Sequence, residues 1–229
     1  MITIVTGASQ NHSKSLKQFL GTLINIKLPY QCYVYDLGLE EEYINSLKEL
    51  YPTFIYRKFD YSKYPEYFNI QINAGEYAWK PVIIEEVSKE IDGIMIWSDS
   101  GNKILDSFER LYTIIENQGI YSSFSCDPIW MWTHPLTLKY FNIQDPNFLN
   151  LICRNGAFIG FDTRKKEVKN FIKDFSRFAQ DKNCIAPPGS NRSNHRQDQA
   201  ILTIMYYQFF KGIYTEWDRI SYNIHNDID

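Results

Sequence analysis

Five short segments hold side chains that can bind a phosphate, a metal ion or a sugar hydroxyl. They are residues 6–9 (TGAS), 77–81 (YAWKP), 97–101 (WSDSG), 154–158 (RNGAF) and 195–199 (HRQDQ). Small residues let a ligand approach the backbone, and hydroxyl, amide, cationic or carboxylate groups then hold it. We expect these segments to contribute to one ligand site.

The first segment, Thr6-Gly7-Ala8-Ser9, follows a short apolar run at residues 2–5. Small residues after a first strand let a ligand come close, and a hydroxyl there can bind a base, a ribose or a phosphate. An ordinary turn between a strand and a helix would give the same pattern. We predict that Thr6, Gly7 and Ala8 contact a nucleotide.

The next two segments each contain one charged group. Lys80 lies near the start of an expected helix, where the helix dipole favours an acid, so a bound anion such as a diphosphate explains it better. Asp99 follows an apolar run at residues 94–97 and lies between Ser98 and Ser100. Carboxylate oxygen suits Mn²⁺ or Mg²⁺, which can bridge it to a diphosphate. A solvent-facing lysine and a helix-capping aspartate are the alternatives.

A polar pair precedes an expected strand at residues 156–161. Arg154 and Asn155 can hydrogen-bond a sugar hydroxyl, and Gly156 leaves room for the ligand. A glycine at a β-bulge explains this pattern equally well.

Residues 195–199 open an expected helix after a loop that contains proline and glycine. An acid in a first helical turn is favourable by itself, so capping alone would explain Asp198. Five consecutive polar side chains, with Arg196 and Gln199 among them, favour substrate binding instead. His225 could complete a metal site, although a late histidine is more often merely exposed.

Composition narrows the class of protein. The chain has 229 residues, 44% of them hydrophobic, which is enough to bury a sizeable core. The net charge of −3 disfavours nucleic-acid binding, since no overall positive field would hold a phosphate backbone. Four widely spaced cysteines lack zinc-site spacing and predict buried free thiols in a reducing compartment. No apolar run is long enough to span a membrane, so we expect a cytoplasmic protein.

Strands and helices alternate in the first half of the chain. Apolar patterns predict strands at residues 2–5, 32–35, 54–56 and 94–97, and helices from residue 13 and at 40–51, 77–91 and 104–117. The second half predicts a strand at 156–161, helices at 163–180 and 197–210, a loop at 183–196, and short strands near Ile213 and Tyr222. This order predicts an α/β fold with a mostly parallel sheet, which binds ligands at the carboxyl ends of its strands.

A short-chain dehydrogenase is one alternative, because such enzymes also begin with TGAS. The chain further offers Asn73-Ala74-Gly75 and a Tyr207/Lys211 pair. The two additional glycines that would cradle a dinucleotide pyrophosphate are missing after residue 9. NAD(P) binding is therefore the less favoured prediction.

Taken in order, the motifs resemble a family of glycosyltransferase-like proteins with the GT-A fold. The resembling stretches are residues 5–9, 78–81, 97–100, 156–157, 184–190 and 195–199. The resemblance implies a single-domain GT-A fold, a UDP- or GDP-sugar donor, and Mn²⁺ or Mg²⁺ held by a DxD motif. Here that motif is Ser98-Asp99-Ser100, with one acid rather than two, so Lys80 or Arg154 could neutralise the diphosphate instead.

The resemblance also implies roles for individual residues. Asp198-Gln199 matches the pair that lines the sugar pocket, and Asn155-Gly156 resembles a strand of the retaining enzymes of glycosyltransferase family 8. The catalytic candidates are then Asp198, Gln199 and Asn155. The donor-binding candidates are Thr6, Gly7, Ala8, Lys80, Ser98, Asp99, Arg154, Gly156 and Arg196, and the metal candidates are Asp99, His195 and His225.

The sequence therefore predicts a glycosyltransferase built as one domain over residues 1–229. Residues 1–104 would bind the nucleotide and residues 105–229 the sugar and the acceptor, with Trp130 and Trp132 on the acceptor side. The sequence does not distinguish a glycan, a protein and a small molecule as the acceptor. A module that binds a nucleotide-sugar or a glycan without turnover is the alternative, because the single acid at residues 98–100 also suits a degenerate site.

Overall fold

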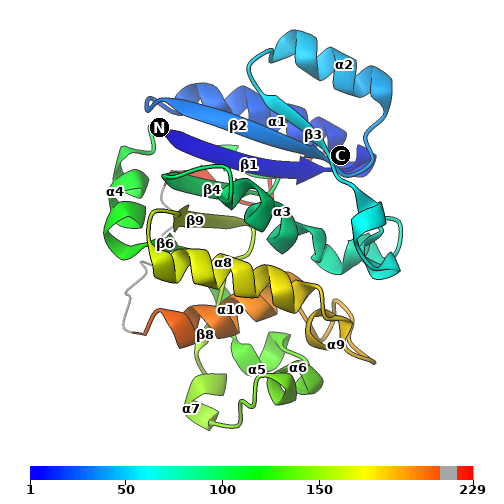
Figure 1. The fold of residues 1–229 in the computed structure, drawn as a ribbon, viewed down its shortest axis with the longest axis vertical. Helices are drawn as coiled ribbons and strands as arrows, with labels where there is room; N and C mark the ends of the chain where they lie inside the picture. The colour runs from blue at the N-terminus through cyan, green and yellow to red at the C-terminus, as the bar shows by residue number, and fades with distance from the viewer. Residues whose placement is uncertain (212–220, 229) are drawn as a thin grey trace.

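The computed structural model describes residues 1–211 and 221–228, and a six-stranded sheet lies at its centre (Figure 1). The strand order is β3-β2-β1-β4-β9-β6. β1 (Ile2–Ala8) pairs in parallel with β2 (Tyr30–Asp36) and β4 (Ile94–Ser98), and β2 pairs in parallel with β3 (Ile55–Lys58). β9 (Phe158–Asp162) is antiparallel to β4 and to β6 (Ile120–Tyr121). The predicted α/β fold with a mostly parallel sheet is confirmed.

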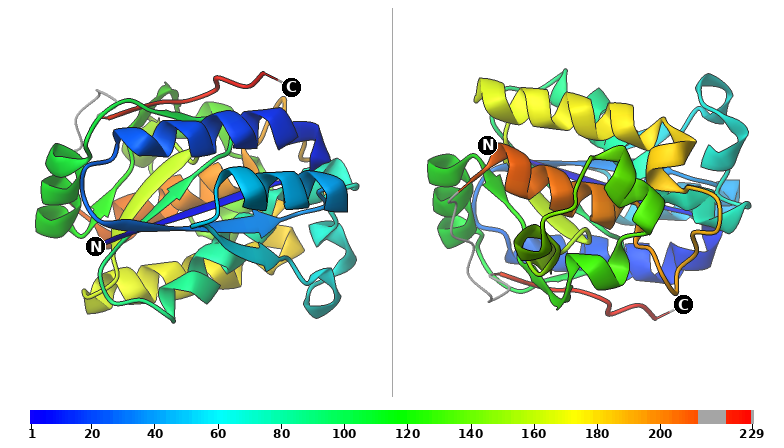
Figure 2. Two further views of the ribbon diagram at one scale, coloured as in Figure 1. Left: turned by 90° about the horizontal axis from the view of Figure 1, so that it is seen from above. Right: turned by 90° about the horizontal axis from the view of Figure 1, so that it is seen from below.

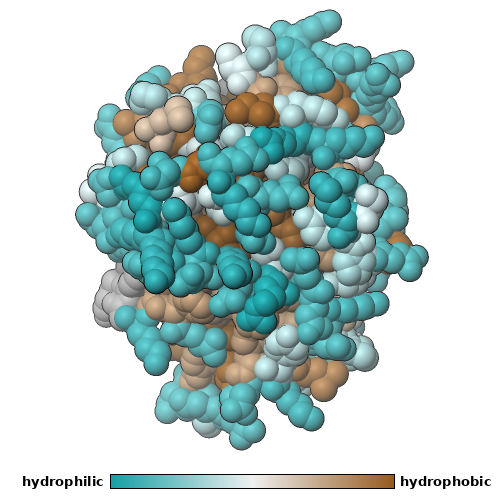
Figure 3. Space-filling view, in the orientation of Figure 1, coloured by the Kyte–Doolittle hydropathy of each residue, from teal (hydrophilic) through white to brown (hydrophobic). Residues whose placement is uncertain are grey.

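Helices cover both faces of this sheet (Figure 2). Alternate residues of β1 and β4 face opposite helices, because successive strand side chains point to opposite sides. One core joins the sheet to α1 (Ser13–Thr22), α2 (Glu41–Leu50) and α4 (Glu109–Gln118). The other core joins it to α3 (Trp79–Ser88), α8 (Lys166–Ala179) and α10 (Gln197–Phe209). The outer surface over α8 is mostly hydrophilic, as expected for a helix that buries one face (Figure 3).

Smaller elements surround the sheet. β5 (Lys103–Ile104) pairs with β10 (Tyr222–Asn223), and β7 (Phe124–Pro128) pairs with β8 (Ile152–Arg154). The short helices are α5 (Ile129–Trp132), α6 (Pro135–Tyr140), α7 (Pro146–Leu149) and α9 (Lys182–Ile185). The 3₁₀ turns are η1 (Gln10–His12), η2 (Leu23–Asn25), η3 (Tyr61–Lys63), η4 (Glu66–Phe68) and η5 (Asn73–Tyr77). None of the helices within the described residues is long and apolar enough to cross a membrane.

Several local predictions differ from the structure. β1 continues to Ala8, so Thr6 to Ala8 belong to a strand and not to a turn. The helix expected at 104–117 begins only at Glu109, because residues 103–104 pair with the tail and leave Leu105 exposed. The loop expected at 183–196 starts inside the short helix α9. The expected strand near Tyr222 is confirmed, and the one near Ile213 lies outside the described residues.

A left-handed turn, η5, precedes α3. Its five residues have φ between 47° and 63°, a region that L-residues other than glycine enter at a cost of roughly 1–2 kcal/mol each. Gly75 is required there, because a Cβ would collide with the carbonyl oxygen of Phe68. Trp79 Nε1 donates to the Ala74 carbonyl at 3.0 Å and helps to hold the turn. The helix was predicted to begin at Tyr77. This left-handed run explains why α3 begins at Trp79 instead.

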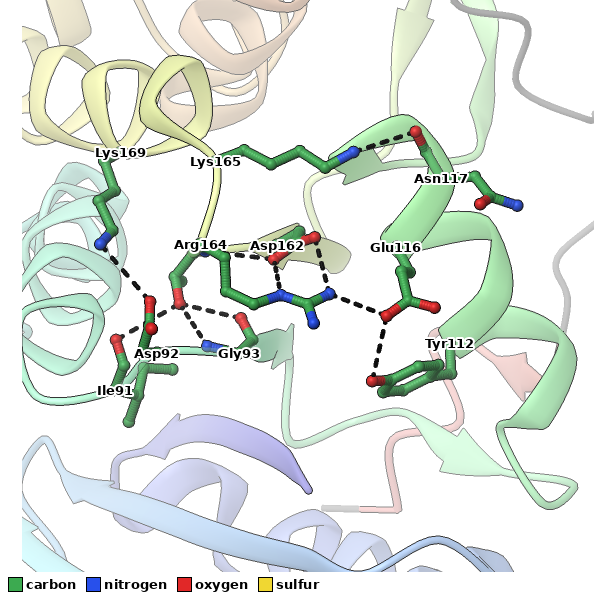
Figure 4. Close-up of polar contacts among 11 residues, drawn as sticks. Ile91, Asp92, Gly93, Tyr112, Glu116, Asn117, Asp162, Arg164, Lys165 and Lys169 are labelled. Carbon is green, nitrogen blue, oxygen red and sulfur yellow. Dashed lines mark hydrogen bonds and ion pairs between the residues drawn. The ribbon is translucent and has the colours of Figure 1, made fainter.

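Ionic contacts around Arg164 lie near the amino end of β4. Arg164 donates from Nε to Asp162 Oδ1 at 2.8 Å and from Nη2 to Glu116 Oε1 at 3.0 Å (Figure 4). Asp162 ends β9 opposite Ile94, whereas residues 99–102 follow the carboxyl end of β4. The contacts therefore join β9, α4 and the segment before α8 at the edge of the sheet that lies opposite the pocket described below.

Candidate active site

A pocket of about 720 Å³ lies at the carboxyl ends of β1, β2 and β4. Parallel α/β sheets generally bind their ligands at this edge. Its walls come from both halves of the chain and from the C-terminal segment. Predicted site residues that line it are Gly7, Ala8, Lys80, Asp99, Gly156, Arg196, Asp198, Gln199 and His225.

Lys80 links two acids in the wall of this pocket. Its Nζ lies 3.1 Å from Asp99 Oδ1 and 2.9 Å from Asp198 Oδ2, and it donates to the Gly156 carbonyl at 3.1 Å. The side chains of Lys80 and Asp198 are only 4% and 8% exposed, while that of Asp99 is 36% exposed. We call Asp99, Lys80 and Asp198 the Lys80 triad.

The charges of the Lys80 triad depend on each other. Burial by itself would lower the pKa of Lys80, but the carboxylates of Asp198 and Asp99 outweigh it and raise that pKa above its usual value. Burial raises the pKa of Asp198, and Lys80 opposes that rise. Lys80 therefore stays charged, and its charge is already matched by two acids. We predicted a bound diphosphate beside Lys80. In the structure, the anions beside Lys80 are two side chains of the protein, Asp99 and Asp198.

The indole of Trp97 orients Asp99. Trp97 Nε1 donates to Asp99 Oδ1 at 2.7 Å, and the backbone N–H of Asp99 donates to the Ala157 carbonyl at 2.8 Å. Asn102 Nδ2 binds that same carbonyl at 2.8 Å and Ser98 Oγ at 3.0 Å. The carboxylate of Asp99 is therefore held in one position at the end of β4.

Gly156 brings the start of α10 close to the end of β4. A Cβ at this position would lie 3.3 Å from Gln199 Cβ, which is tighter than ordinary contact, and 3.4 Å from Asp198 Oδ2, which is in van der Waals contact. The Gly156 N–H donates to Gln199 Oε1 at 3.3 Å. The predicted pair of Asp198 and Gln199 is in this way placed against the predicted Gly156.

Five predicted site residues lie outside the pocket lining. Thr6 and Ser98 are fully buried, and the Thr6 hydroxyl has no hydrogen-bond partner among the described residues. Because both side chains are buried and lie outside the pocket lining, they do not face a ligand in this pocket, which corrects their predicted donor-binding role. The other three are Arg154, Asn155 and His195.

Arg154 and Asn155 serve the fold around β8. The Arg154 guanidinium lies 4.1 Å from the ring centroids of both Phe124 and Tyr206 and donates to the Ser122 carbonyl at 3.3 Å. Asn155 is 4% exposed, and its Oδ1 accepts from the Ala157 N–H at 2.8 Å. Arg154 is therefore not free to neutralise a diphosphate, and Asn155 shapes the turn that presents Gly156.

His195 is a buried structural histidine. Its Nδ1 accepts from the His134 N–H at 3.2 Å, so Nε2 keeps the proton and donates to the Ile185 carbonyl at 2.9 Å. Both nitrogens are occupied, which corrects its predicted role as a metal ligand. Burial lowers the pKa of His195 to about 4.

This buried imidazole predicts a pH dependence of stability. The unfolded chain binds a proton near pH 6.5, and the folded chain does so only near pH 4. The stabilisation is complete above pH 6.5 and is lost as the pH falls toward 4, amounting to about 3 kcal/mol. Urea unfolding at pH 7 and pH 5 measures about 2 kcal/mol of this loss. The difference between the two pH values should shrink in His195→Gln and persist in His12→Gln, whose side chain is exposed. Equal pH dependence in all three proteins would refute the prediction.

The residues do not assemble the predicted metal site. Among the described residues, no three histidines, cysteines, aspartates or glutamates lie together in a metal-binding arrangement. Asp99 Oδ1 is already bound by Lys80 and Trp97. His225 lines the pocket, as does Asp227, whose carboxylate occupies the space that a side chain on Gly101 would need. The protein's own donor set among the described residues thus does not fit a bound Mn²⁺ or Mg²⁺.

Sequence patterns missed several residues of the pocket. Arg192 donates from Nη1 to the Tyr77 hydroxyl at 2.6 Å, and both residues line the cavity. Tyr77 lies in the candidate segment 77–81 but was given no role there, and Arg192 lies in the expected loop at 183–196, where no spacing signal marked it. Cys126 is exposed and lines the pocket, which corrects the expectation that all four thiols are buried.

The two patterns of the dehydrogenase alternative do not share a cavity. Gly7 and Ala8 line the pocket described above, whereas Tyr207 and Lys211 line a second cavity of about 620 Å³. The Tyr207 hydroxyl donates to the Ile152 carbonyl at 2.7 Å. The geometry therefore does not bring Tyr207 and Lys211 to the end of β1.

Comparisons with known proteins agree with this fold. The family described as "Protein of unknown function (DUF1647)" matches residues 1–85, and no curated protein matches the chain significantly. Among solved structures, the bifunctional glycosyltransferase WbbM is similar at a TM-score of 0.58 and 13% identity, over 91% of this chain and 37% of that one. The galactosyltransferase LgtC, solved with donor and acceptor sugar analogues, is similar at a TM-score of 0.55 and 16% identity. This similarity covers 92% of this chain and 71% of LgtC. The chain has the GT-A-like α/β fold of these glycosyltransferases and spans little more than a third of WbbM.

Proposed function

We propose that this protein is a glycosyltransferase that moves a sugar from a UDP- or GDP-sugar to an acceptor hydroxyl. The observation that supports this most is the Lys80 triad in the wall of a pocket at the carboxyl edge of the sheet. The likeness of the fold to WbbM and LgtC supports the same class of reaction.

The pocket suggests how the substrates lie. In our proposal the nucleotide contacts Gly7 and Ala8 at the end of β1, and the sugar lies beside Asp99, Asp198 and Gln199. The acceptor approaches along Trp132, which lines the pocket, while Trp130 lies outside the lining. This places the base and the ribose on residues 1–104, as predicted for the nucleotide half, and the sugar and the acceptor on residues 105–229.

The reaction breaks the bond between the anomeric carbon and the diphosphate oxygen and forms a bond from that carbon to the acceptor oxygen, and the acceptor hydroxyl loses its proton to the departing diphosphate. Positive charge develops at the anomeric centre as the bond breaks, and fixed carboxylates stabilise it. Asp99 and Asp198 provide that negative charge, and Lys80 holds both in place. We keep retention of configuration as the proposed course, and the anomer of the product, read by nuclear magnetic resonance, tests it.

Donor binding tests the proposal directly. A ligand that binds only the folded state raises its stability by about 2.7 kcal/mol at a hundredfold excess over its dissociation constant. We expect one UDP- or GDP-sugar to raise the melting temperature, with and without Mn²⁺ present. The same sugar nucleotide should slow alkylation of Cys126, which is the exposed thiol of the pocket. Cys126→Ser measures the background labelling of the other thiols. We expect this background to be low, because burial raises the pKa of Cys32 and Cys153 to about 12 and keeps them as unreactive thiols.

The outcomes separate the candidate functions. Binding of a sugar nucleotide without hydrolysis or transfer to any acceptor in a glycan panel would identify a binding module. Stabilisation by NAD(H) alone would restore the dehydrogenase alternative. If no nucleotide slows the alkylation of Cys126, the donor does not bind in this pocket.

A further inference from the structure

Three permanently charged cations line the pocket among the described residues: Lys80, Arg192 and Arg196. Lys80 is already bound by two carboxylates, so it offers a ligand no uncompensated charge. A diphosphate that enters this pocket must therefore find its positive charge elsewhere.

Arg192 and Arg196 are cations that no described carboxylate neutralises. The Arg192 guanidinium lies 5.4 Å from the ring centroid of Tyr77 and donates to the hydroxyl of that residue. The Arg196 guanidinium lies 4.0 Å from the ring centroid of Trp132. The Trp132 indole is itself fixed, because its Nε1 donates to Asp127 Oδ2 at 2.9 Å. Both guanidiniums are thus held on aromatic rings and keep most of their N–H donors for a ligand.

Such a pair suits a diphosphate. A guanidinium forms two parallel hydrogen bonds to phosphate oxygens, and stacking on a ring fixes the plane of the fork beforehand. Two such groups can balance the two negative charges of the diphosphate in a sugar nucleotide. The acids of the pocket cannot do this without an added cation, and the described residues show no arrangement of acids that would hold one.

We propose that Arg192 and Arg196 bind the donor diphosphate in place of the metal ion that the family resemblance implies. This inference rests on the proposed function and deepens it, since it predicts donor binding without a divalent ion. As the bond to the sugar breaks, the same two groups stabilise the negative charge on the leaving nucleoside diphosphate.

Titration calorimetry on the full chain in EDTA tests the proposal, with UDP, GDP and inorganic pyrophosphate as probes. Arg192→Gln and Arg196→Gln should each weaken UDP or GDP binding about 10- to 100-fold, as expected for lost hydrogen bonds to a charged group. Binding of uridine or guanosine should not change, because these lack phosphates. Arg177→Gln is the matched control, since Arg177 also stacks on a ring, Phe178, at 4.1 Å but lies outside the pocket lining.

The possible results differ in what they overturn. Nucleotide binding that needs Mn²⁺ and is unchanged in both arginine variants would overturn the inference and leave the transferase intact. Arginine-dependent binding of pyrophosphate without binding of any nucleotide would support the anion site and contradict the proposed function. Absence of binding by all three probes would overturn both.

Discussion

Lys80→Met should lower the free energy of unfolding by about 3–5 kcal/mol, because it leaves two acids in the pocket wall without their cation. Asp198 is the more affected of the two, since its carboxylate is almost fully buried. The methionine chain fills nearly the same volume as the lysine stem, so the loss reports charge and not a cavity. Urea unfolding at pH 7 measures it.

A second substitution separates this effect from general damage to α3. Adding Asp198→Asn to Lys80→Met removes one uncompensated acid and should restore part of the lost stability. Lys89→Met is the control at the end of the same helix, because Lys89 is 66% exposed and its pair with Glu85 should contribute less than about 1 kcal/mol. Equal stability of Lys80→Met and the wild type would contradict the buried pairing.

Asp99→Asn should reduce transfer about 10²- to 10³-fold and leave the fold intact, because it removes a charge placed where the reaction develops the opposite charge. An asparagine oxygen can still accept from Trp97 Nε1 and from Lys80, which bind Asp99 Oδ1 in the native protein. The substitution also leaves Lys80 matched by one acid, Asp198, so the Lys80 triad becomes neutral. Initial rates with the donor found above measure the effect.

Asp127 provides a matched control for this experiment. It lines the same pocket and likewise accepts from an indole, that of Trp132. Asp127→Asn therefore removes the same charge from the same cavity, but away from the Lys80 triad. The asparagine oxygen can still accept from Trp132 Nε1, so the ring under Arg196 stays fixed, and we expect activity within a few-fold of the wild type. Similar losses in both variants would show that the total charge of the pocket matters, and normal turnover in Asp99→Asn would rule out its catalytic role.

The fold was largely predictable because its elements are encoded locally. Continuous apolar runs mark the buried parallel strands β1 and β4, and helical spacing marks α1 and α8. Errors arose where distant segments override local preference. Residues 103–104 form a strand because the tail pairs with them, and η5 is left-handed because Phe68 and Trp79 pack around it.

The sequence by itself determined that polar groups at the ends of β1 and β4 meet at one edge of a sheet, since parallel strands present their carboxyl ends together. It could not show which groups face the ligand. Only the tertiary structure decided that Thr6, Asn155, Arg154 and His195 are buried, and that the anions beside Lys80 are Asp99 and Asp198. It likewise brought Arg192 and Tyr77 together from distant parts of the chain. Burial and charge pairing depend on which segments pack against each other, and the spacing of residues along one chain does not contain that information.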